Sequence, residues 1–530
     1  MSLLKSNSKE ILEKFADYDL LGRRDVFVDE TIKTPKWLHF GSGNIFRAYI
    51  ADVSQKMILK GYNQGVIVCE SFDSEILDKS YKENDNICLS STINFDGSIS
   101  TKLISSICKS LCLNTNKDDR SYFINAMSSK ALQIVSFTVT EKAYEIFSSK
   151  GELLPVIKED LNKDLEDSCH LLSNQLLGLK NRFINGAAPI TFMALDNCNH
   201  NGDKLKSSIY ALADLYHEKG QLSSDFIDYL HSDKVSFPLS MIDKIAPRPS
   251  EHVLKHLQKE GVKGLDILKT AKGTFISDFV NSEPTAYLVV EDSFTNGRPP
   301  FELANVVMTD RHTVELCENM KIETCLNPLQ TAAAISGMLF SYPFISDCMN
   351  DNKIVNLVTL MGKEGIKIVE DPKVIDPNFF LNEALTLRMP NKYIYDTPHR
   401  IATDSSSKIS VRCGLTIKKY LNKGLNPKEL LAVPLVIALF VRYVAGVDDF
   451  GNKYQMPGDL NSSYLKYLQD KLFVGNPSLS KDAIEELLNN QTIMGCNLKE
   501  AGIFDFTQCL CLEMFKGYGA VANTLEKYLL

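Results

Sequence analysis

The stretch at residues 36–48, KWLHFGSGNIFRA, decides how the first half of the chain folds. Its first five residues form a short apolar run typical of a buried strand. A helical pattern then continues to Lys60, and Gly61 ends the predicted helix. Gly41 permits a tight turn, and Gly43 lets the backbone come close to a bound group. The stretch therefore predicts a strand, a glycine turn and a helix whose first N–H groups face an anion.

An acidic residue follows at the distance that a dinucleotide-binding turn requires. The next predicted strand, GVIVCE at 65–70, ends in Glu70, and Asp73 lies close behind it. A carboxylate there bonds the ribose hydroxyls and repels a 2′-phosphate, so it favours NAD over NADP. The turn itself lacks a third glycine, because Phe46 stands in that place. An ordinary strand–helix turn explains the two glycines equally well. The matching acid, Glu70, favours a cofactor site.

Strands and helices alternate through the first half of the chain. Further strands are predicted at 131–141, 189–197 and 286–294, with helical patterns at 9–22 and 164–180. Alternation of this kind indicates an α/β fold with a doubly wound parallel sheet covered on both faces. The cofactor would lie at the carboxyl ends of the strands.

The second half of the chain is predicted to be mostly helical. Gly and Pro in TNGRPPFE, 295–302, mark a linker, so the predicted domains are a Rossmann-type domain at 1–292 and a helical domain at 293–530. The apolar run 430–447 is interrupted by Pro434 and Arg442 and predicts a buried core helix rather than a membrane span. The helices expected in this half are 328–341, 379–388, 411–422, 427–445, 461–472, 480–489 and 506–529.

Composition narrows the class of protein. The 530 residues carry a net charge of −8 and are 44% hydrophobic, which argues against a nucleic-acid binder and suits a small-molecule enzyme with full-sized cores. The 13 cysteines are scattered and the N-terminus has no apolar signal segment, so reduced thiols in a cytoplasmic protein are expected. His252 and His256 are four apart but lack a third ligand, so no metal is predicted. Tyr467 and Lys471 have the spacing of a short-chain dehydrogenase pair. They lie in a charged helix far along the sequence from the glycine turn, so the match is interpreted as a coincidence.

Several further motifs resemble, in order, those of the long-chain mannitol dehydrogenase family, which includes fructuronate and tagaturonate reductases. GSGNIFRA at 41–48 resembles the family's glycine turn, and the likeness extends to about residue 452. The other segments that carry it are TVTEKAY (138–144), LDNCNHNGDKLK (195–206), FPLSMIDKIAP (237–247), VVEDSFTNGRPPFE (289–302), CENMKIETCLNPLQTA (317–332), RIATDSSSKISVR (400–412) and AGVDDFGN (445–452).

This resemblance implies an NAD-dependent oxidoreductase that interconverts a ketose or 2-keto sugar acid and its polyol form, with the substrate in a cleft between the domains. Fructuronate with mannonate and fructose with mannitol are the leading pairs. Lys321 would be the general base, which requires burial or nearby cations to lower its pKa from an ordinary value of about 10.4. The other residues implied are Asn327 and Asn197 as donors to the reacting oxygen, Glu318 as proton relay, Gly41, Gly43, Asn44, Ile45, Phe46, Arg47, Glu70, Thr140 and Glu141 for the cofactor, and Asp243, Arg400 and Lys408 for the substrate.

Two departures from the family pattern bear on catalysis. The family spacing from lysine to asparagine is five, whereas Lys321 and Asn327 are six apart, which rotates a helical side chain by about 100° unless a bulge or break absorbs it. Gln330 replaces the family histidine and cannot titrate near neutral pH. These departures leave open a second hypothesis for the function: a protein on the same scaffold that binds a dinucleotide or metabolite. A monomer or a small homo-oligomer is expected in either case, with neither a nucleic acid nor a membrane as partner.

Overall fold

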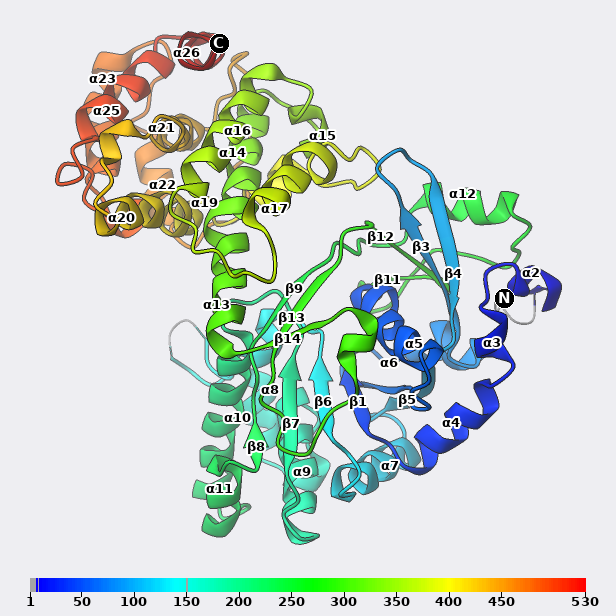
Figure 1. Ribbon diagram of the computed structural model, residues 1–530. Coiled ribbons are helices and arrows are strands. Elements are labelled where there is room, and N and C mark those ends of the chain that lie inside the picture. Colours follow the sequence, from blue (N-terminus) through cyan, green and yellow to red (C-terminus); the bar gives the residue numbers. More distant parts are fainter. Residues whose placement is uncertain (1–5, 8, 149–150) are drawn as a thin grey trace. The chain divides into compact units, whose positions relative to one another are not determined.

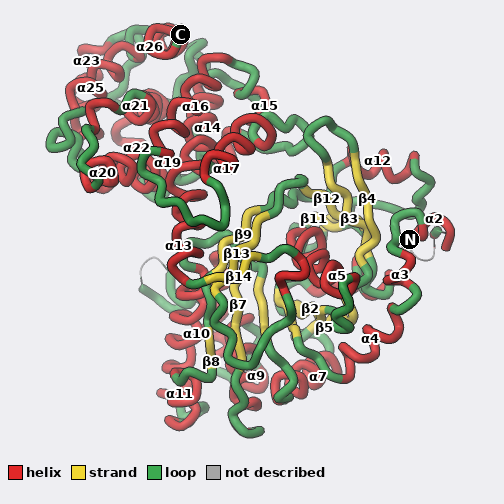
Figure 2. Tube along the Cα trace, in the orientation of Figure 1, coloured by secondary structure: helices red, strands yellow, loops and turns green. Residues whose placement is uncertain are grey.

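A computed structural model describes residues 6–7, 9–148 and 151–530 and divides the chain into two compact units, Met1–Glu315 and Leu316–Leu530 (Figure 1). Every strand described lies in the first unit, and the described residues of the second fold into helices joined by loops (Figure 2). The predicted fold class, a parallel α/β domain followed by a helical one, is confirmed. The predicted boundary between residues 292 and 293 stays a prediction.

A six-stranded parallel sheet forms the centre of the first unit. Numbered by their place in the chain, its strands run in the order 3-2-1-4-5-6, the order of a dinucleotide-binding sheet. Across the sheet these strands are β5 (Ile107–Cys112), β2 (Val66–Glu70), β1 (Trp37–Phe40), β6 (Ile134–Phe137), β7 (Ile190–Ala194) and β8 (Val235–Ser236). The strand order reverses between β1 and β6, so their carboxyl ends define the switch point of the sheet.

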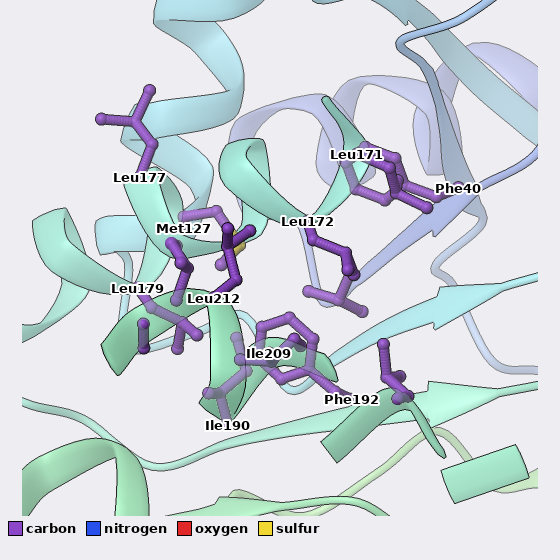
Figure 3. Packing of buried hydrophobic residues seen from close by; sticks show 14 of the residues in the cluster. Phe40, Met127, Leu171, Leu172, Leu177, Leu179, Ile190, Phe192, Ile209 and Leu212 are labelled. Atoms are coloured by element: carbon purple, nitrogen blue, oxygen red, sulfur yellow. The ribbon is translucent and has the colours of Figure 1, made fainter. Parts of the chain in front are cut away.

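Alternate residues of each strand face opposite sides of this sheet, and each side has its own core. On one side Phe40 and Phe192 pack with Met127, Leu172 and Leu212 of the covering helices (Figure 3). Trp37 belongs to the core on the other side. The helices of this unit are α2 (Lys9–Glu13), α3 (Tyr18–Leu21), α4 (Arg24–Lys33), α5 (Ala51–Leu59), α6 (Ser74–Ser80), α7 (Lys117–Ser128), α8 (Pro155–Leu161), α9 (Leu171–Ile184), α10 (Asn201–Glu218), α11 (Ser224–His231), α12 (Glu251–Lys259) and α13 (Arg311–Asn319), which continues past Glu315.

Two smaller sheets and a hairpin complete the first unit. One sheet has the order β12-β3-β4, the other β14-β13-β9, and β10 and β11 pair as a hairpin. Of the strands in these sheets and the hairpin, the sequence predicted only β13, within 286–294. Their bounds are β3 (Cys88–Ile93), β4 (Ile99–Ile104), β9 (Ser240–Asp243), β10 (Leu268–Lys269), β11 (Phe275–Ile276), β12 (Phe279–Ser282), β13 (Tyr287–Glu291) and β14 (Val307–Thr309). The single helix predicted at 9–22 is wrong, because α2 and α3 are separated by a turn.

The second unit is built around α21 (Ala432–Val444), whose every residue is buried, as predicted for a core helix. One helix predicted at 506–529 is wrong: the chain breaks at Gly517 and Gly519, which have φ values of +153° and +75°. None of the described helices is both long and apolar enough to span a bilayer. The others are α14 (Asn327–Leu339), α15 (Ile345–Cys348), α16 (Asn352–Ile366), α17 (Pro377–Glu383), α18 (Pro398–Ile401), α19 (Ser405–Ile409), α20 (Leu415–Asn422), α22 (Ser462–Gln469), α23 (Pro477–Leu488), α24 (Gln491–Met494), α25 (Phe504–Met514) and α26 (Ala520–Leu529), with π-helical turns η6 (Met320–Cys325), η7 (Ala384–Arg388) and η8 (Ser410–Gly414).

A ladder of buried hydrogen bonds joins β1 to β6 below the switch point. Trp37 Nε1 donates to Ser136 Oγ at 2.7 Å, and His39 bonds the same oxygen through Nδ1 at 2.7 Å. His39 Nε2 lies 2.8 Å from Thr138 Oγ1, which donates to the Gly41 carbonyl at 3.4 Å. Because that hydroxyl proton is used, His39 donates from Nε2, and in the neutral ring Nδ1 accepts from the Ser136 hydroxyl. Both ring nitrogens of a neutral His39 are thus paired.

Acid should weaken the first unit through His39. Burial lowers the pKa of His39 to about 3, so the unfolded chain binds a proton that the folded chain does not. Its contribution to stability is complete above pH 6.5 and falls as the pH drops towards 3, by about 2 kcal/mol at pH 5. Urea unfolding at pH 7 and pH 5 should show this loss, and His39→Gln should reduce it. The exposed His252→Gln variant is the control; equal pH dependence in wild type and His39→Gln would contradict the assignment.

Candidate active site

The glycine turn follows β1 directly and lies against the end of β6. Gly41 has a φ of +106°, and a Cβ added there would lie 2.3 Å from the Thr138 carbonyl oxygen. The N–H of Gly41 donates to the Cys69 carbonyl at the end of β2, at 3.3 Å. Only glycine fits a position with this φ and this backbone approach. The turn is therefore held at the point where the strand order reverses.

Gly43 differs from Gly41 in having open space around it. A Cβ built on Gly43 would meet no atom within 4 Å, and its φ lies outside the left-handed region. The chain then enters a π-helical turn, η1 (Phe46–Ile50), which leads into α5. Backbone N–H groups at such a helix start attract anions. The open face at Gly43, beside these groups, fits the pyrophosphate of a dinucleotide.

Glu70 ties the glycine turn to the loop that follows β2. Its Oε2 accepts from Ser42 Oγ at 2.6 Å, and its Oε1 accepts from the N–H groups of Ser71 and Phe72 at 3.0 and 2.8 Å. The residue is 9% exposed. The turn and its predicted acid are thus brought into direct contact. The carboxylate is fixed beside the turn, and its bond to a ribose stays a prediction.

The side chains that follow Gly43 hold the turn in place. Arg47 is buried; it donates to the Ser277 carbonyl at 2.6 Å and to Asn44 Oδ1 at 3.1 Å. The Asn44 amide donates to the Pro247 carbonyl at 3.2 Å. Phe46 is also buried and stacks on His39, with ring centroids 4.4 Å apart. Ile45 is half-buried and packs against the same core.

Three predicted residues follow the ends of β6 and β7. Thr140 and Glu141 come after β6 and are exposed, and Glu141 forms an ion pair with Lys204 of α10. Asn197 comes after β7 and is also exposed. Since the carboxyl ends of parallel strands lie along one edge of a sheet, these residues share the edge that carries Gly41. The cofactor candidates of the first unit therefore lie along one edge.

Asp243 lies outside the six-stranded sheet, at the end of β9. It is buried, as is its neighbour Lys244, whose Nζ donates to the Glu283 carbonyl and lies 5.9 Å from the Tyr49 ring centroid. Burial lowers the pKa of Lys244 to about 8. Lys244 was not predicted as a site residue, although it stands inside the motif FPLSMIDKIAP.

Lys321 lies in the second unit, within the π-helical turn η6. Lys321 and Glu318 are 3% and 5% exposed. The N–H of Leu326 caps the Lys321 carbonyl, five residues back rather than four. A π-helical turn takes up one additional residue. The six-residue spacing from Lys321 to Asn327 is thereby absorbed before α14 begins.

Asn327 and Gln330 lie in the first turn of α14 and are half-buried. Asn327 is not the N-cap of this helix; that position is Leu326, and no side chain caps it. Within residues 9–148 and 151–530, neither side-chain amide forms a hydrogen bond. Both amides therefore keep their donors available for a ligand. Lys321, Glu318, Asn327 and Gln330 lie on one continuous stretch, as the motif predicts.

The two predicted substrate cations differ in their surroundings. The Arg400 side chain is 71% exposed and bound at two points to Asp396, at 2.8 and 2.7 Å. Lys408 is half-buried and donates to the Ile401 carbonyl at 2.7 Å, and burial and Arg412 lower its pKa to about 8. Arg412 lies one helical turn further on and donates to the Asn327 carbonyl at 2.9 Å. Arg412 was not predicted as a site residue, although it ends the motif RIATDSSSKISVR.

Two further motifs were given no role from the sequence. His252 and His256 lie on α12, and no cluster of three or more potential metal-binding His, Cys, Asp or Glu side chains occurs in the described part of the chain. Lys471 donates to the Tyr467 hydroxyl, far along the sequence from the glycine turn.

The two glycines of the turn should respond differently to an added methyl group. Gly41→Ala should unfold or strongly destabilise the first unit because of its φ and the contact with Thr138. Gly43→Ala should leave the melting temperature nearly unchanged but weaken NADH binding at least tenfold, since the methyl occupies open space that the cofactor needs. Thermal melts and NADH titrations of both variants test this. Unchanged NADH affinity in Gly43→Ala would contradict the assignment.

Comparison with known proteins gives a consistent result. The family model described as the mannitol dehydrogenase Rossmann domain matches residues 35–303, and the one described as the mannitol dehydrogenase C-terminal domain matches 313–507. The chain is 41% identical to D-mannonate oxidoreductase of Thermotoga maritima over 98% of both chains. It is 27% identical to mannitol 2-dehydrogenase of Neosartorya fischeri, over 86% of this chain and 87% of that one.

Two solved structures of polyol dehydrogenases also match most of the chain. The mannitol 2-dehydrogenase of Pseudomonas fluorescens, solved with NAD and D-mannitol, matches with a TM-score of 0.68 and 25% identity over 93% of this chain and 94% of that one. A substrate-free D-sorbitol dehydrogenase matches in fold with a TM-score of 0.72 and 21% identity, covering 91% and 96%. The glycine turn, the switch point and these full-length matches point the same way: this chain is an NAD-dependent oxidoreductase that belongs to the mannitol dehydrogenase family.

Proposed function

We propose that the chain interconverts a 2-keto sugar acid and its polyol form, with fructuronate and mannonate as the leading pair. The observation that carries the proposal is the 41% identity to a D-mannonate oxidoreductase along nearly the whole chain. A neutral pair, fructose and mannitol, is the second candidate, because more distant relatives are named mannitol 2-dehydrogenases.

The basic pair Lys408 and Arg412 supports the sugar acid. Neither side chain forms an ion pair with an acid among the described residues, and burial lowers the pKa of both groups. Arg412 Nε is buried and lacks a hydrogen-bond partner. Partly buried cations that form no ion pair favour an anionic ligand. Arg400 is a weaker candidate, because Asp396 already neutralises it and the Arg400 side chain is exposed to solvent.

Lys321 is proposed as the general base in oxidation and the general acid in reduction. NAD, held at the glycine turn, would supply the hydride acceptor, and Lys321 Nζ would take the hydroxyl proton. The lysine must be neutral before it accepts that proton, and its side chain is buried. Glu318, three residues earlier, is proposed to pass the proton to solvent.

Asn327 is proposed to donate a hydrogen bond to the reacting oxygen as negative charge develops there, and Asn197 is proposed for the same task. Gln330 stands where the family has a histidine. Its amide can orient a substrate hydroxyl by donating or accepting, but it does not exchange protons near neutral pH. Proton transfer is therefore assigned to Lys321 and Glu318 alone. Asp243 is proposed to anchor a further hydroxyl.

A substrate panel tests the proposed function. NADH oxidation should be fastest with fructuronate, compared with tagaturonate and fructose at equal concentration. Lys408→Met should raise the KM for fructuronate at least tenfold and change the KM for fructose less, since only the acid loses an ionic contact. Lys418→Met, an exposed lysine on α20, is the matched control. Preference for fructose, or equal effects of Lys408→Met on both substrates, would contradict the sugar-acid assignment.

A second experiment tests the base. Lys321→Ala should lower kcat by about 10²- to 10⁴-fold, the usual contribution of general acid–base catalysis, and keep the affinity for NADH. Steady-state kinetics and NADH fluorescence titration measure the two effects separately. Lys419→Ala, which removes a lysine paired with Glu323 of η6, is the control for disturbance of the π-helical turn. Unchanged turnover in Lys321→Ala would exclude Lys321 as the base.

A further inference from the structure

A phenylalanine stands exposed beside the acid that ends β2. Phe72 is two residues after Glu70 and is 70% exposed, although its neighbour Asp73 is only 3% exposed. A fully buried phenylalanine side chain is worth roughly 1.5–3 kcal/mol, so leaving one in water forgoes that stabilisation. The ring is thus available to a ligand at the carboxyl edge of the sheet.

The loop that carries Phe72 is held on both sides. The N–H of Phe72 donates to Glu70 Oε1 at 2.8 Å, and the Asn114 amide, after β5, donates to the Ser71 carbonyl. On the other side, the hydroxyl of Thr270 donates to Asp73 at 2.7 Å. The exposure of the ring therefore does not come from a loosely held backbone.

The hairpin β10–β11 covers one side of this loop. Its turn places Lys272 Nζ 4.3 Å from the centre of the Phe72 ring. The turn is fixed by the Ala271 N–H, which donates to Glu75 at 2.6 Å, and by the Thr274 hydroxyl, which donates to Asp73 at 3.0 Å. A cation held over an aromatic face stabilises that arrangement. Lys272 therefore lies over one face of the ring, and most of the Phe72 surface stays open to solvent.

We propose that Phe72, backed by Lys272, is the stacking platform for the adenine base of NAD. The loop after β2 is the part of this fold nearest Glu70, the acid predicted to bind the ribose, so the base belongs beside it. Every nucleobase has a π-face that stacks on an aromatic side chain. The platform rests on NAD as the cofactor and does not depend on which sugar is the substrate.

Ligands that each contain one half of the cofactor separate this role from a structural one. Phe72→Ala should raise the Kd for NADH and for ADP-ribose by about 5- to 100-fold, the range expected for loss of one base–aromatic stack. The Kd for reduced nicotinamide mononucleotide, which has no adenine, should not change. Phe72→Trp should restore tight binding. Lys272→Met should weaken ADP-ribose binding by about 2- to 5-fold.

Phe379→Ala, which removes a phenylalanine 62% exposed on α17, is the matched control and should bind all three ligands normally. Fluorescence titration and calorimetry of the full chain give these affinities without any sugar substrate. Unchanged ADP-ribose affinity in Phe72→Ala would overturn the proposal. Equal weakening for reduced nicotinamide mononucleotide would also overturn it, because the loop would then act only through the shape of the whole site.

Discussion

The close approach of Gly41 to the Thr138 carbonyl is the constraint on which the first unit depends. It fixes the turn against the end of β6, at the point where the strand order reverses. The buried ladder through His39 holds the same two strands together below the turn. Because both features are built from short contacts, the turn keeps one shape, and its backbone N–H groups are oriented before any anion arrives.

Local patterns in the sequence were enough to predict the main sheet and the turn. Strands of a parallel sheet are apolar throughout, so β1, β2, β6 and β7 stood out from their surroundings. The strands β3 and β4 did not, since CLSSTI and ISTKLI are rich in Ser and Thr and carry no apolar run. The hairpin β10–β11 was missed for a similar reason: it is short, and its contacts with Asp73 and Glu75 join residues nearly 200 positions apart.

The residues of the candidate site could be named from the sequence, but their arrangement in space could not. The motif around Lys321 named the residues, whereas the π-helical turn that absorbs the additional residue depends on how the turn packs against α14 and α16. Arg400 and Asp396 are only four residues apart, so their pairing could have been foreseen as a local contact, although Asp396 precedes α18. The bond from Arg412 to the Asn327 carbonyl joins residues 85 positions apart and could not.

Side chains around the cofactor turn fall into two groups with different expected effects when they are changed. Arg47 and Asn44 direct their hydrogen bonds to the carbonyls of distant segments, so their loss should lower stability before it lowers affinity. Phe72 contributes little to the core and should do the reverse. The proposed NAD site separates two tasks: buried polar side chains fix the backbone, and main-chain N–H groups and an exposed ring are left for the ligand. Turn substitutions can therefore be sorted by whether the melting temperature or the NADH affinity falls first.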